Sequence, residues 1–382
     1  MNILITTPTY PPFNSGLGNV VQIQAKLLSQ LGHDVTIATG GQSGVIRFDE
    51  VANAKVIEFA ISGADYIPRP IRGEKDKYAE FLQHGNFDVI LLNAWQNWAT
   101  DLALNYLDVI ESKVFVYSHC ISTNSFIGAN FIRSLASYLF WRPYWFGLSK
   151  KIKKLRGIIF LSSSGCDSRF DDLQLSLKLK VKYWIIPNAI PTYAEEAMCL
   201  SSKAKDVRTQ ITSVASYDWF KGHDFVIRAY ANSSAKNVIP LKIFGQKFTK
   251  YTEELKALAN AVGVLDEFIE FNENLSGSEL MDEYLKSLVF IGGSYSECQP
   301  LVILDAMAAG VPFISRKSGS IPMLEGGYSV ADHFEASKML DVLVKDENVW
   351  IEKNQAGRNY ISNNHTQDRV KNILFEFLEG IG

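Results

Sequence analysis

The stretch "LVFIGGSYSECQPLVILDAMAAG", residues 288–310, decides the fold because it contains a strand, a loop and a helix in succession. The apolar run at its start is typical of a strand that is buried on both faces. Pro300 suits the first turn of the following helix, where its missing N–H costs nothing. A strand that leads through a short loop into a helix is the repeating unit of a parallel α/β sheet.

Similar short apolar runs recur along the chain, with longer amphipathic segments between them. In sequence order they are "NILITT", "DVTIAT", "FDVILLN", "KVFVYSH", "GIIFLSS", "YWIIPN", "ITSVAS", "LKIFG", "FIEFN", "LVFIGGS" and "PFISR". Runs of four to six residues that alternate with helical patterns predict parallel strands covered by helices. We therefore expect an α/β fold of the doubly wound type.

Two domains are predicted. A second series of strands begins near Ile211, after a polar stretch at residues 191–209 whose weak periodicity favours a linker. A length of 382 residues also exceeds what one ordinary core accommodates. We expect a Rossmann-like domain at residues 1–190 and another at residues 205–360, facing each other across a cleft.

The composition excludes several classes of protein. With 47% hydrophobic and 21% charged residues the chain is typical of globular proteins, and its net charge of −3 gives no general attraction to nucleic acid. The cysteines lack CxxC spacing and no D-x-D occurs, so no metal site is predicted. The N-terminus lacks a basic segment before an apolar run, and no apolar run reaches about 18 residues. We expect a cytoplasmic location.

The loop and helix of residues 294–310 predict an anion site between two carboxylates. Backbone amides of residues 301–303 would be free at the start of the helix, where the helix dipole is positive. Glu297 precedes this turn and Asp305 follows it, so the carboxylates flank the anion and accept hydrogen bonds from hydroxyl groups. A sugar nucleotide has hydroxyls on both sides of a diphosphate. The predicted donor-binding residues here are Pro300, Leu301, Val302 and Asp305.

Glu297, seven intervening residues and Asp305, within "SYSECQPLVILDAMAAGVP", resemble the E-x7-E motif of retaining GT-B glycosyltransferases. The resemblance is to the large family four of glycogen-synthase-like and lipopolysaccharide-type enzymes. It implies that Glu297 contacts the donor sugar as a catalytic residue. It also implies that Asp305 holds the ribose hydroxyls of the nucleotide.

The resemblance extends over nearly the whole chain. "PTYPPFNSGLGNVVQIQAKLLSQLGHDVTIAT" is similar to the family's glycine-rich loop, helix and strand, which implies that Gly16 and Gly18 approach the donor phosphates. "KVFVYSHC" places His119 where the family has a histidine at a strand end of the acceptor domain, which implies a catalytic role in contacting the donor sugar or steering the acceptor. "YWIIPNAI" resembles the I-P-N-G segment. "SVASYDWFKGHDFVIRAY" resembles the G-R-L-x-x-x-K-G segment, which makes Lys221 a catalytic cation for the diphosphate.

Several departures from the family pattern bear on the donor. Ser216 occupies the position of the family arginine, which leaves Lys221 as the only matched cation. Asp305 replaces the usual second glutamate, and Ala189 the glycine of I-P-N-G. Three basic residues that follow strand ends are candidates to replace the missing charge: Lys247, Arg316 and Lys317.

The resemblance implies a hexosyltransferase-type enzyme of polysaccharide or lipopolysaccharide biosynthesis. It would move a sugar, with retention and without metal or other cofactor, from a nucleoside diphosphate sugar to a hydroxyl of a glycan or lipid-linked glycan. Residues 361–382, with helical spacing of apolar residues, would return to the first domain. The alternatives are a nucleotide-sugar epimerase of the same plan and a non-catalytic nucleotide-sugar-binding protein, the latter suggested by Ser216.

Each candidate also has a purely structural explanation. Glu297 could be a carboxylate at a loop end and Asp305 an exposed helix residue paired with a lysine. His119 could be a structural histidine at a strand end, and Lys221 a solvated lysine. Gly16 and Gly18 could serve a tight turn only, because an isolated glycine-rich loop is weak evidence.

A second feature, "SYLFWRPYWFGLSKKIKKLRG" at residues 137–157, joins aromatic to basic residues. Aromatic side chains settle at the headgroup level of a membrane, and each nearby cation adds about 1 kcal/mol toward an anionic leaflet. This predicts peripheral contact with the inner face of an anionic membrane and a lipid-linked acceptor. The alternative is a packed aromatic turn before a solvated helix. The residues concerned are Trp141, Tyr144, Trp145, Lys150, Lys151, Lys153 and Lys154.

Overall fold

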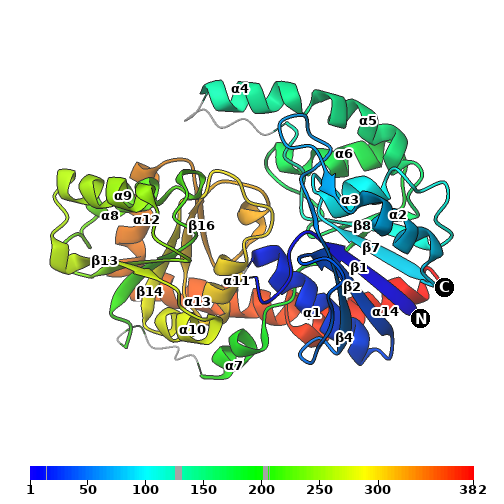
Figure 1. Cartoon of the computed structure of the whole chain (residues 1–382). Coiled ribbons are helices and arrows are strands. Elements are labelled where there is room, and N and C mark those ends of the chain that lie inside the picture. Colours follow the sequence, from blue (N-terminus) through cyan, green and yellow to red (C-terminus); the bar gives the residue numbers. More distant parts are fainter. Residues whose placement is uncertain (14, 125–130, 201–204, 206) are drawn as a thin grey trace. The chain divides into compact units, whose positions relative to one another are not determined.

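The computed structural model describes residues 1–13, 15–124, 131–200, 205 and 207–382. The chain forms two compact units, unit 1 with Met1–Ala189 and Gln367–Gly382, and unit 2 with Ile190–Thr366. Each unit has a sheet whose two faces are covered by helices (Figure 1). Within the described ranges, no helix is long and apolar enough to cross a membrane.

Unit 1 contains an eight-stranded sheet of order β10-β9-β8-β7-β1-β2-β4-β3. Neighbouring strands are parallel except β3 and β4, which are antiparallel. The strands are β1 (Asn2–Thr7), β2 (Asp34–Gly40), β3 (Ile46–Asp49), β4 (Ala54–Phe59), β7 (Val89–Asn93), β8 (Lys113–Ser118), β9 (Gly157–Phe160) and β10 (Tyr183–Ile185). A separate antiparallel pair of short strands follows β4 along the chain and consists of β5 (Ile61–Ser62) and β6 (Arg72–Gly73).

The helices of unit 1 are α1 (Gly16–Gln30), α2 (Lys75–His84), α3 (Trp98–Ala103), α4 (Phe131–Phe140), α5 (Arg142–Ile152), α6 (Asp171–Lys178) and α14 (Gln367–Glu379). The last of these, α14, packs against α1. Its Phe377 ring meets the rings of Phe115 and Trp184 edge-on, with centroids 5.1 and 5.0 Å away. Lys26 Nζ also donates to Gln367 Oε1 at 2.9 Å. The last helix thus completes the core of unit 1.

Unit 2 contains a six-stranded parallel sheet of order β13-β12-β11-β14-β15-β16. The strands are β11 (Gln210–Val214), β12 (Leu241–Gly245), β13 (Ile269–Glu273), β14 (Ser287–Gly292), β15 (Phe313–Arg316) and β16 (Gly327–Val330). The helices are α7 (Thr192–Leu200), α8 (His223–Ala231), α9 (Lys250–Ala261), α10 (Gly277–Leu285), α11 (Leu301–Ala308), α12 (His333–Lys345) and α13 (Glu347–Asn364). Both sheets are doubly wound and predominantly parallel, as predicted.

The predicted linker at residues 191–209 is wrong for its first half. Thr192–Leu200 forms α7, which packs against α10 and α11 within unit 2. Its buried residues are the small Ala194 and Ala197, so the helix has little apolar periodicity in sequence. Residues 201–204 and 206, also part of the predicted linker, lie outside the described residues.

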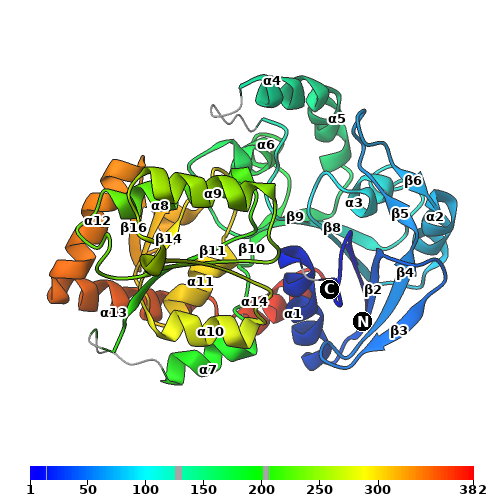
Figure 2. The same cartoon turned by 60° about the vertical axis from the view of Figure 1, so that its left-hand side comes forward.

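The strand orders fix where a ligand can bind in each unit. In unit 2 the chain passes from β11 outward to β12 and β13, and then returns to β14 on the other side of β11. In unit 1 the same reversal falls between β1 and β7. Ligands of doubly wound sheets bind at the carboxyl ends of the strands at such a reversal. A ligand site in unit 2 is therefore expected at the loops that follow β11 and β14 (Figure 2).

Candidate active site

The loops that follow β11 and β14 join through one ion pair in unit 2. Lys221 Nζ donates to Glu297 Oε1 at 2.8 Å. The two side chains are 25% and 19% exposed, so the pair is sheltered but open to solvent on one side. The structure thus brings together two residues that the sequence places 76 positions apart.

Two glycines let these loops approach each other. Gly222, next to Lys221, has φ of +65° and faces Gly293. A Cβ on Gly222 would lie 2.0 Å from the Gly293 carbonyl oxygen, and a Cβ on Gly293 would lie 1.9 Å from the Gly222 oxygen. Because real side chains never tolerate such distances, both positions require glycine. This contact fixes Lys221 relative to the loop that carries Glu297.

A third loop, after β15, holds the backbone of Glu297. The Glu297 amide donates to Ser318 Oγ at 2.7 Å. Gly319, with φ of +52°, packs so closely that a Cβ there would lie 2.1 Å from the Glu297 oxygen. The sequence analysis missed Ser318 and Gly319, although "KSGS" after a strand is a turn signal.

Helix α11 begins one residue later than predicted. Pro300 is the N-cap with φ of −73°, not a residue of the first turn, and no side chain caps the helix. The Ile303 amide donates to the Pro300 carbonyl at 3.1 Å, so the prediction that this amide is free is wrong. The amides of Leu301 and Val302 donate to no acceptor among the described residues. Two amides and the helix dipole therefore remain for an anion.

Asp305 is buried in α11 and is not the exposed helix residue of the structural alternative. It is 8% exposed, and its Oδ1 makes no hydrogen bond within the described part of the chain. Burial raises the pKa of this carboxyl to about 7. Tyr193 and Tyr284 lie near it: their own burial, and then the Asp305 charge, raise both pKa values. A buried carboxyl oxygen without a donor is suited to accept a ligand hydroxyl.

The position of the missing arginine carries no charge. Ser216 Oγ donates to Asp218 Oδ2 at 2.9 Å. Of the three candidate replacements, Lys247 and Lys317 are exposed. Arg316 lies against the loop of Glu297: its guanidinium carbon is 4.1 Å from the Tyr295 ring centroid, and its Nε donates to Gly293 O at 3.1 Å. Arg316 thus contacts this loop through Gly293 and Tyr295.

In unit 1 the glycine-rich loop opens α1. Ser15 is the N-cap, and its Oγ accepts a hydrogen bond from the Gly18 amide at 3.0 Å. Gly18 is buried, and a Cβ there would lie 3.1 Å from the Thr9 carbonyl oxygen. Packing alone therefore favours glycine at Gly18. Gly16 is exposed at the first position of the helix.

His119 follows β8 and lies beside Asn93 at the end of β7. Its Nε2 is 3.1 Å from Asn93 Oδ1, an acceptor, so Nε2 carries the proton. Burial, and then the nearby Arg169 charge, lower the pKa of His119 to about 4. The imidazole is therefore neutral at pH 7. The sequence analysis did not single out Asn93, although it ends the buried run "VILLN".

Two of the aromatic residues predicted to contact a membrane are packed inside unit 1. Trp141 is buried and stacks on Tyr66, with ring centroids 4.2 Å apart. Tyr144 is buried and donates to Asp101 Oδ1 at 2.8 Å. The prediction is wrong for both, because side chains distant in sequence cover them. Trp145 is half-buried.

The predicted basic residues divide into two groups. Lys150 and Lys153 are exposed. Lys151 pairs with Asp65 at 3.2 Å, and Lys154 pairs with Asp108 at 2.5 Å. The ion pairs reduce the charge that the last two present to solvent.

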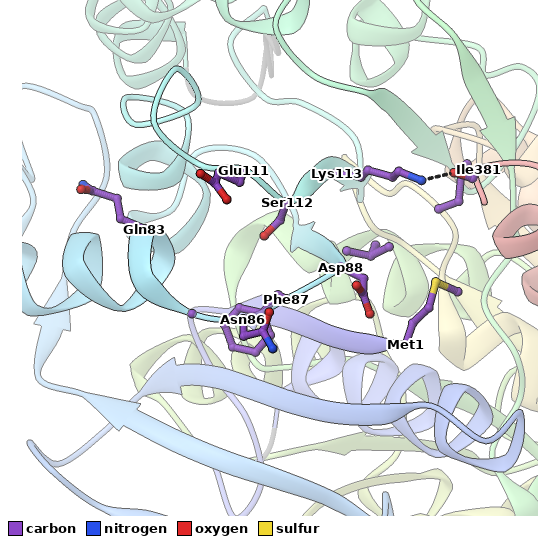
Figure 3. Close-up of a pocket in the computed structure, with 11 residues that line it drawn as sticks. Met1, Gln83, Asn86, Phe87, Asp88, Glu111, Ser112, Lys113 and Ile381 are labelled. Atoms are coloured by element: carbon purple, nitrogen blue, oxygen red, sulfur yellow. Dashed lines mark hydrogen bonds between the residues drawn. The ribbon is translucent and has the colours of Figure 1, made fainter.

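One pocket of unit 1 lies at the wrong edge of the sheet to be the site (Figure 3). Met1, Val89 and Lys113 line it, at the amino ends of β1, β7 and β8. Lys113 Nζ donates there to the carbonyl of Ile381 at 2.5 Å. Ligands of doubly wound sheets bind at the opposite edge, so this pocket belongs to the packing of the chain ends.

Comparison with known proteins bears on the fold and on the class of this chain. Residues 201–363 match the family described as glycosyl transferases group 1. The structure resembles sucrose-phosphate synthase from Thermosynechococcus elongatus, with a TM-score of 0.73 and 14% identity over 100% of this chain and 98% of that one. It also resembles Anabaena HepE in complex with UDP and glucose, with a TM-score of 0.71 and 14% identity over 100% of both chains.

Two curated relatives are also glycosyl-transferring enzymes by name. Alpha-monoglucosyldiacylglycerol synthase of Streptococcus pneumoniae is 24% identical over 373 residues, which is 90% of this chain and 78% of the relative. Sulfoquinovosyl transferase SQD2 of Arabidopsis thaliana is 35% identical over 72 residues, 19% of this chain and 13% of the relative.

The two doubly wound units and the full-length structural matches define a protein of the GT-B fold. Within that class, residues 201–363 match the glycosyl transferases group 1. It is a glycosyltransferase.

Proposed function

We propose that the enzyme transfers a sugar from a nucleoside diphosphate sugar to a hydroxyl of a lipid-linked or glycan acceptor, with retention and without a metal ion. The observation that carries the proposal is the arrangement in unit 2. An ammonium group and a carboxylate, Lys221 and Glu297, are paired at 2.8 Å, and two unused amides and a buried carboxyl are provided by α11.

Each group in this arrangement has a role toward one part of the donor. Lys221 and the amides of Leu301 and Val302 supply positive charge, which stabilises the negative charge that develops on the departing nucleoside diphosphate. Glu297 would accept hydrogen bonds from the donor sugar, and Asp305 from the ribose. Lys221 pairs with Glu297, and donor phosphate oxygens would compete for the same ammonium group.

The source of this positive charge supports the proposal that no metal is needed. The ammonium group and helix amides are fixed by the fold and provide at the diphosphate what a divalent ion provides in other enzymes. We expect full activity in the presence of EDTA. Activity that EDTA abolishes and magnesium restores would overturn this part of the proposal.

The first donor and acceptor to test come from the neighbours. HepE was solved with UDP and glucose, and the Streptococcus relative is named for a glucosylated diacylglycerol. We therefore propose UDP-glucose as donor and a diacylglycerol-type lipid as acceptor, reached at the cytoplasmic face of a membrane.

The decisive experiment incubates the full chain with labelled UDP-glucose, with and without lipid acceptor. We expect a labelled lipid and free UDP only when acceptor is present, and an α-linkage by NMR if the sugar keeps its configuration. Glu297→Gln is the matched control and should lose transfer. A donor sugar altered without acceptor would indicate an epimerase, and donor binding without UDP release under all conditions would indicate a non-catalytic binder.

A further inference from the structure

Helix α4 carries its apolar side chains on the outside. Phe131, Ile132, Leu135 and Leu139 are 60%, 82%, 41% and 58% exposed. Positions i, i+1, i+4 and i+8 lie on one side of a helix, so these residues form one stripe. The buried residue of α4 is the small, polar Ser134. A surface helix normally buries its apolar stripe, and a stripe that faces out is typical of a binding surface.

The position of α4 within unit 1 leaves this stripe accessible. Figures 1 and 2 show α4 as the outermost helix of the unit, continued by α5, which runs back toward β9. On α5, Phe146 is 72% exposed. Helix α5 therefore also presents an apolar side chain to solvent.

The same segment is strongly basic. Residues 131–156 contain seven lysines and arginines and not one aspartate or glutamate, in a chain whose net charge is −3. Lys150, Lys153 and Arg156 are exposed and make no ion pair with any residue that the structure describes. An apolar stripe beside uncompensated positive charge complements an anionic, partly apolar surface.

We infer that α4 is an interfacial helix that seats unit 1 on an anionic lipid bilayer. Its stripe enters the boundary between headgroups and acyl chains, and the basic residues at the end of α5 and just after it lie among anionic headgroups. Ten residues rise about 15 Å, so α4 lies along the surface and does not span it. The inference rests on the proposed function, since the lipid acceptor would be taken from this surface.

A second copy of the chain fits this surface less well. Pairing two α4 stripes would bring together two copies of the exposed charges of Lys150, Lys153 and Arg156, in segments that contain no aspartate or glutamate of their own. Like charges at an interface oppose association. The charge thus favours a bilayer that contains anionic lipid over self-association.

The experiment measures flotation of the full chain with vesicles of phosphatidylcholine, with and without phosphatidylglycerol. We expect binding to the anionic vesicles, and at least a tenfold loss in the double variant Ile132→Ser/Leu139→Ser. Neutralising Lys150 and Lys153 to glutamine should cost about fivefold per lysine at low salt. The matched control is Ile46→Ser/Phe48→Ser on β3, whose side chains are 62% and 60% exposed, and it should bind as the native protein does.

Further measurements separate this inference from the proposed function. Circular dichroism checks that each variant is folded. Calorimetry with UDP-glucose should give the same affinity for the native protein and for the α4 variants, because α4 contributes none of the groups assigned to the donor.

Three outcomes would overturn the inference. The first is unchanged flotation of Ile132→Ser/Leu139→Ser. The second is an equal loss in the β3 control, and the third is a stable dimer in sedimentation that the α4 variant disperses. If vesicle binding follows the expected pattern and donor binding is absent throughout, the proposed function fails and the membrane surface stands.

Discussion

Replacing Asp305 with asparagine should separate the stability of unit 2 from its capacity to bind a donor. Burial raises the pKa of the Asp305 carboxyl from an ordinary 3.8 to about 7. Because the pKa is higher in the folded than in the unfolded chain, the carboxyl increasingly destabilises the fold as pH rises from about 4 to about 7. Above pH 7 the effect is constant. The difference between the two pKa values corresponds to about 4 kcal/mol of free energy of unfolding, at about 1.4 kcal/mol per pH unit.

An asparagine keeps the shape of the side chain but cannot ionise. We therefore expect the free energy of unfolding of Asp305→Asn, relative to the native protein, to increase by about 3 kcal/mol between pH 5 and pH 8. The buried amide itself costs about 1–3 kcal/mol if its donors lack partners, at every pH. The variant should accordingly be the more stable protein at pH 8 and lose this advantage at pH 5.

The same substitution should weaken donor binding. An ionised carboxylate accepts hydrogen bonds from ribose hydroxyls, and hydrogen bonds to charged groups contribute about 1.5–3 kcal/mol each. We expect the affinity of the native protein for UDP-glucose to rise with pH up to about 7 and then to level off. The affinity of Asp305→Asn should be at least tenfold lower at pH 8 and independent of pH.

The assays are urea unfolding and calorimetry at pH 5, 6, 7 and 8. Two-domain proteins can unfold in more than one step, so hydrogen exchange of the amides in unit 2 gives a local measure of stability. Asp282→Asn, at an exposed position of α10, is the matched control and should change neither property. A pH dependence of stability that is the same in Asp305→Asn and in the native protein would refute the reasoning.

Three further predictions concern the loop after β11. Lys221→Met should lower kcat/KM about 10²- to 10³-fold in steady-state assays while Lys221→Arg keeps most of the activity, and equal losses would show that charge is not what matters. Gly222→Ala should destabilise unit 2 by at least about 2 kcal/mol in urea unfolding, because the new Cβ would lie 2.0 Å from the Gly293 oxygen and the backbone φ is +65°. Unchanged stability would mean that the two loops can separate freely. Ser216→Arg should raise donor affinity about tenfold in calorimetry by restoring the family's second cation, and no gain would show that another group already supplies that charge.

The sequence predicted the strands that form the middle of both sheets. "FDVILLN" and "KVFVYSH" became β7 and β8, because buried parallel strands are short runs of apolar residues. It missed β4, in which buried and more exposed residues are mixed, and β16, in which only Val330 is buried. Strands at or near an edge mix exposed and buried positions, so their runs are interrupted and resemble loops.

The candidate site was predictable where it depends on spacing along the chain. Glu297 and Asp305 bracket the start of one helix, and that relation is local. The contacts of Glu297 with Lys221 and Ser318 join different strand ends. Only the strand order brings these loops together, and no pattern in a single sequence gives that order. Burial raises the pKa of Asp305, and the neighbours of its side chain include Tyr193 and Tyr284, which belong to other helices. A single sequence does not show that these residues lie close together.

The membrane segment shows a different limit. Helical spacing tells which residues share a side of a helix, but not which side the rest of the protein covers. The sequence analysis placed Trp141 in a membrane-contacting cluster because the residue that covers it, Tyr66, is far away in sequence. The exposed stripe of α4 lies just before the aromatic cluster that the sequence analysis singled out. The predicted lipid-binding surface is therefore assigned to α4 in place of that cluster, and it remains a prediction.

The return of α14 to unit 1 bears on how the polypeptide matures during synthesis. Unit 2 is a continuous insertion between Ala189 and Gln367, so a ribosome completes it before the last helix of unit 1 emerges. Until then Phe115 and Trp184 lack the Phe377 ring that covers them in the finished protein. The apolar surface of unit 1 therefore stays incompletely covered until α14 has been synthesised, and such exposed surface favours aggregation of the nascent chain.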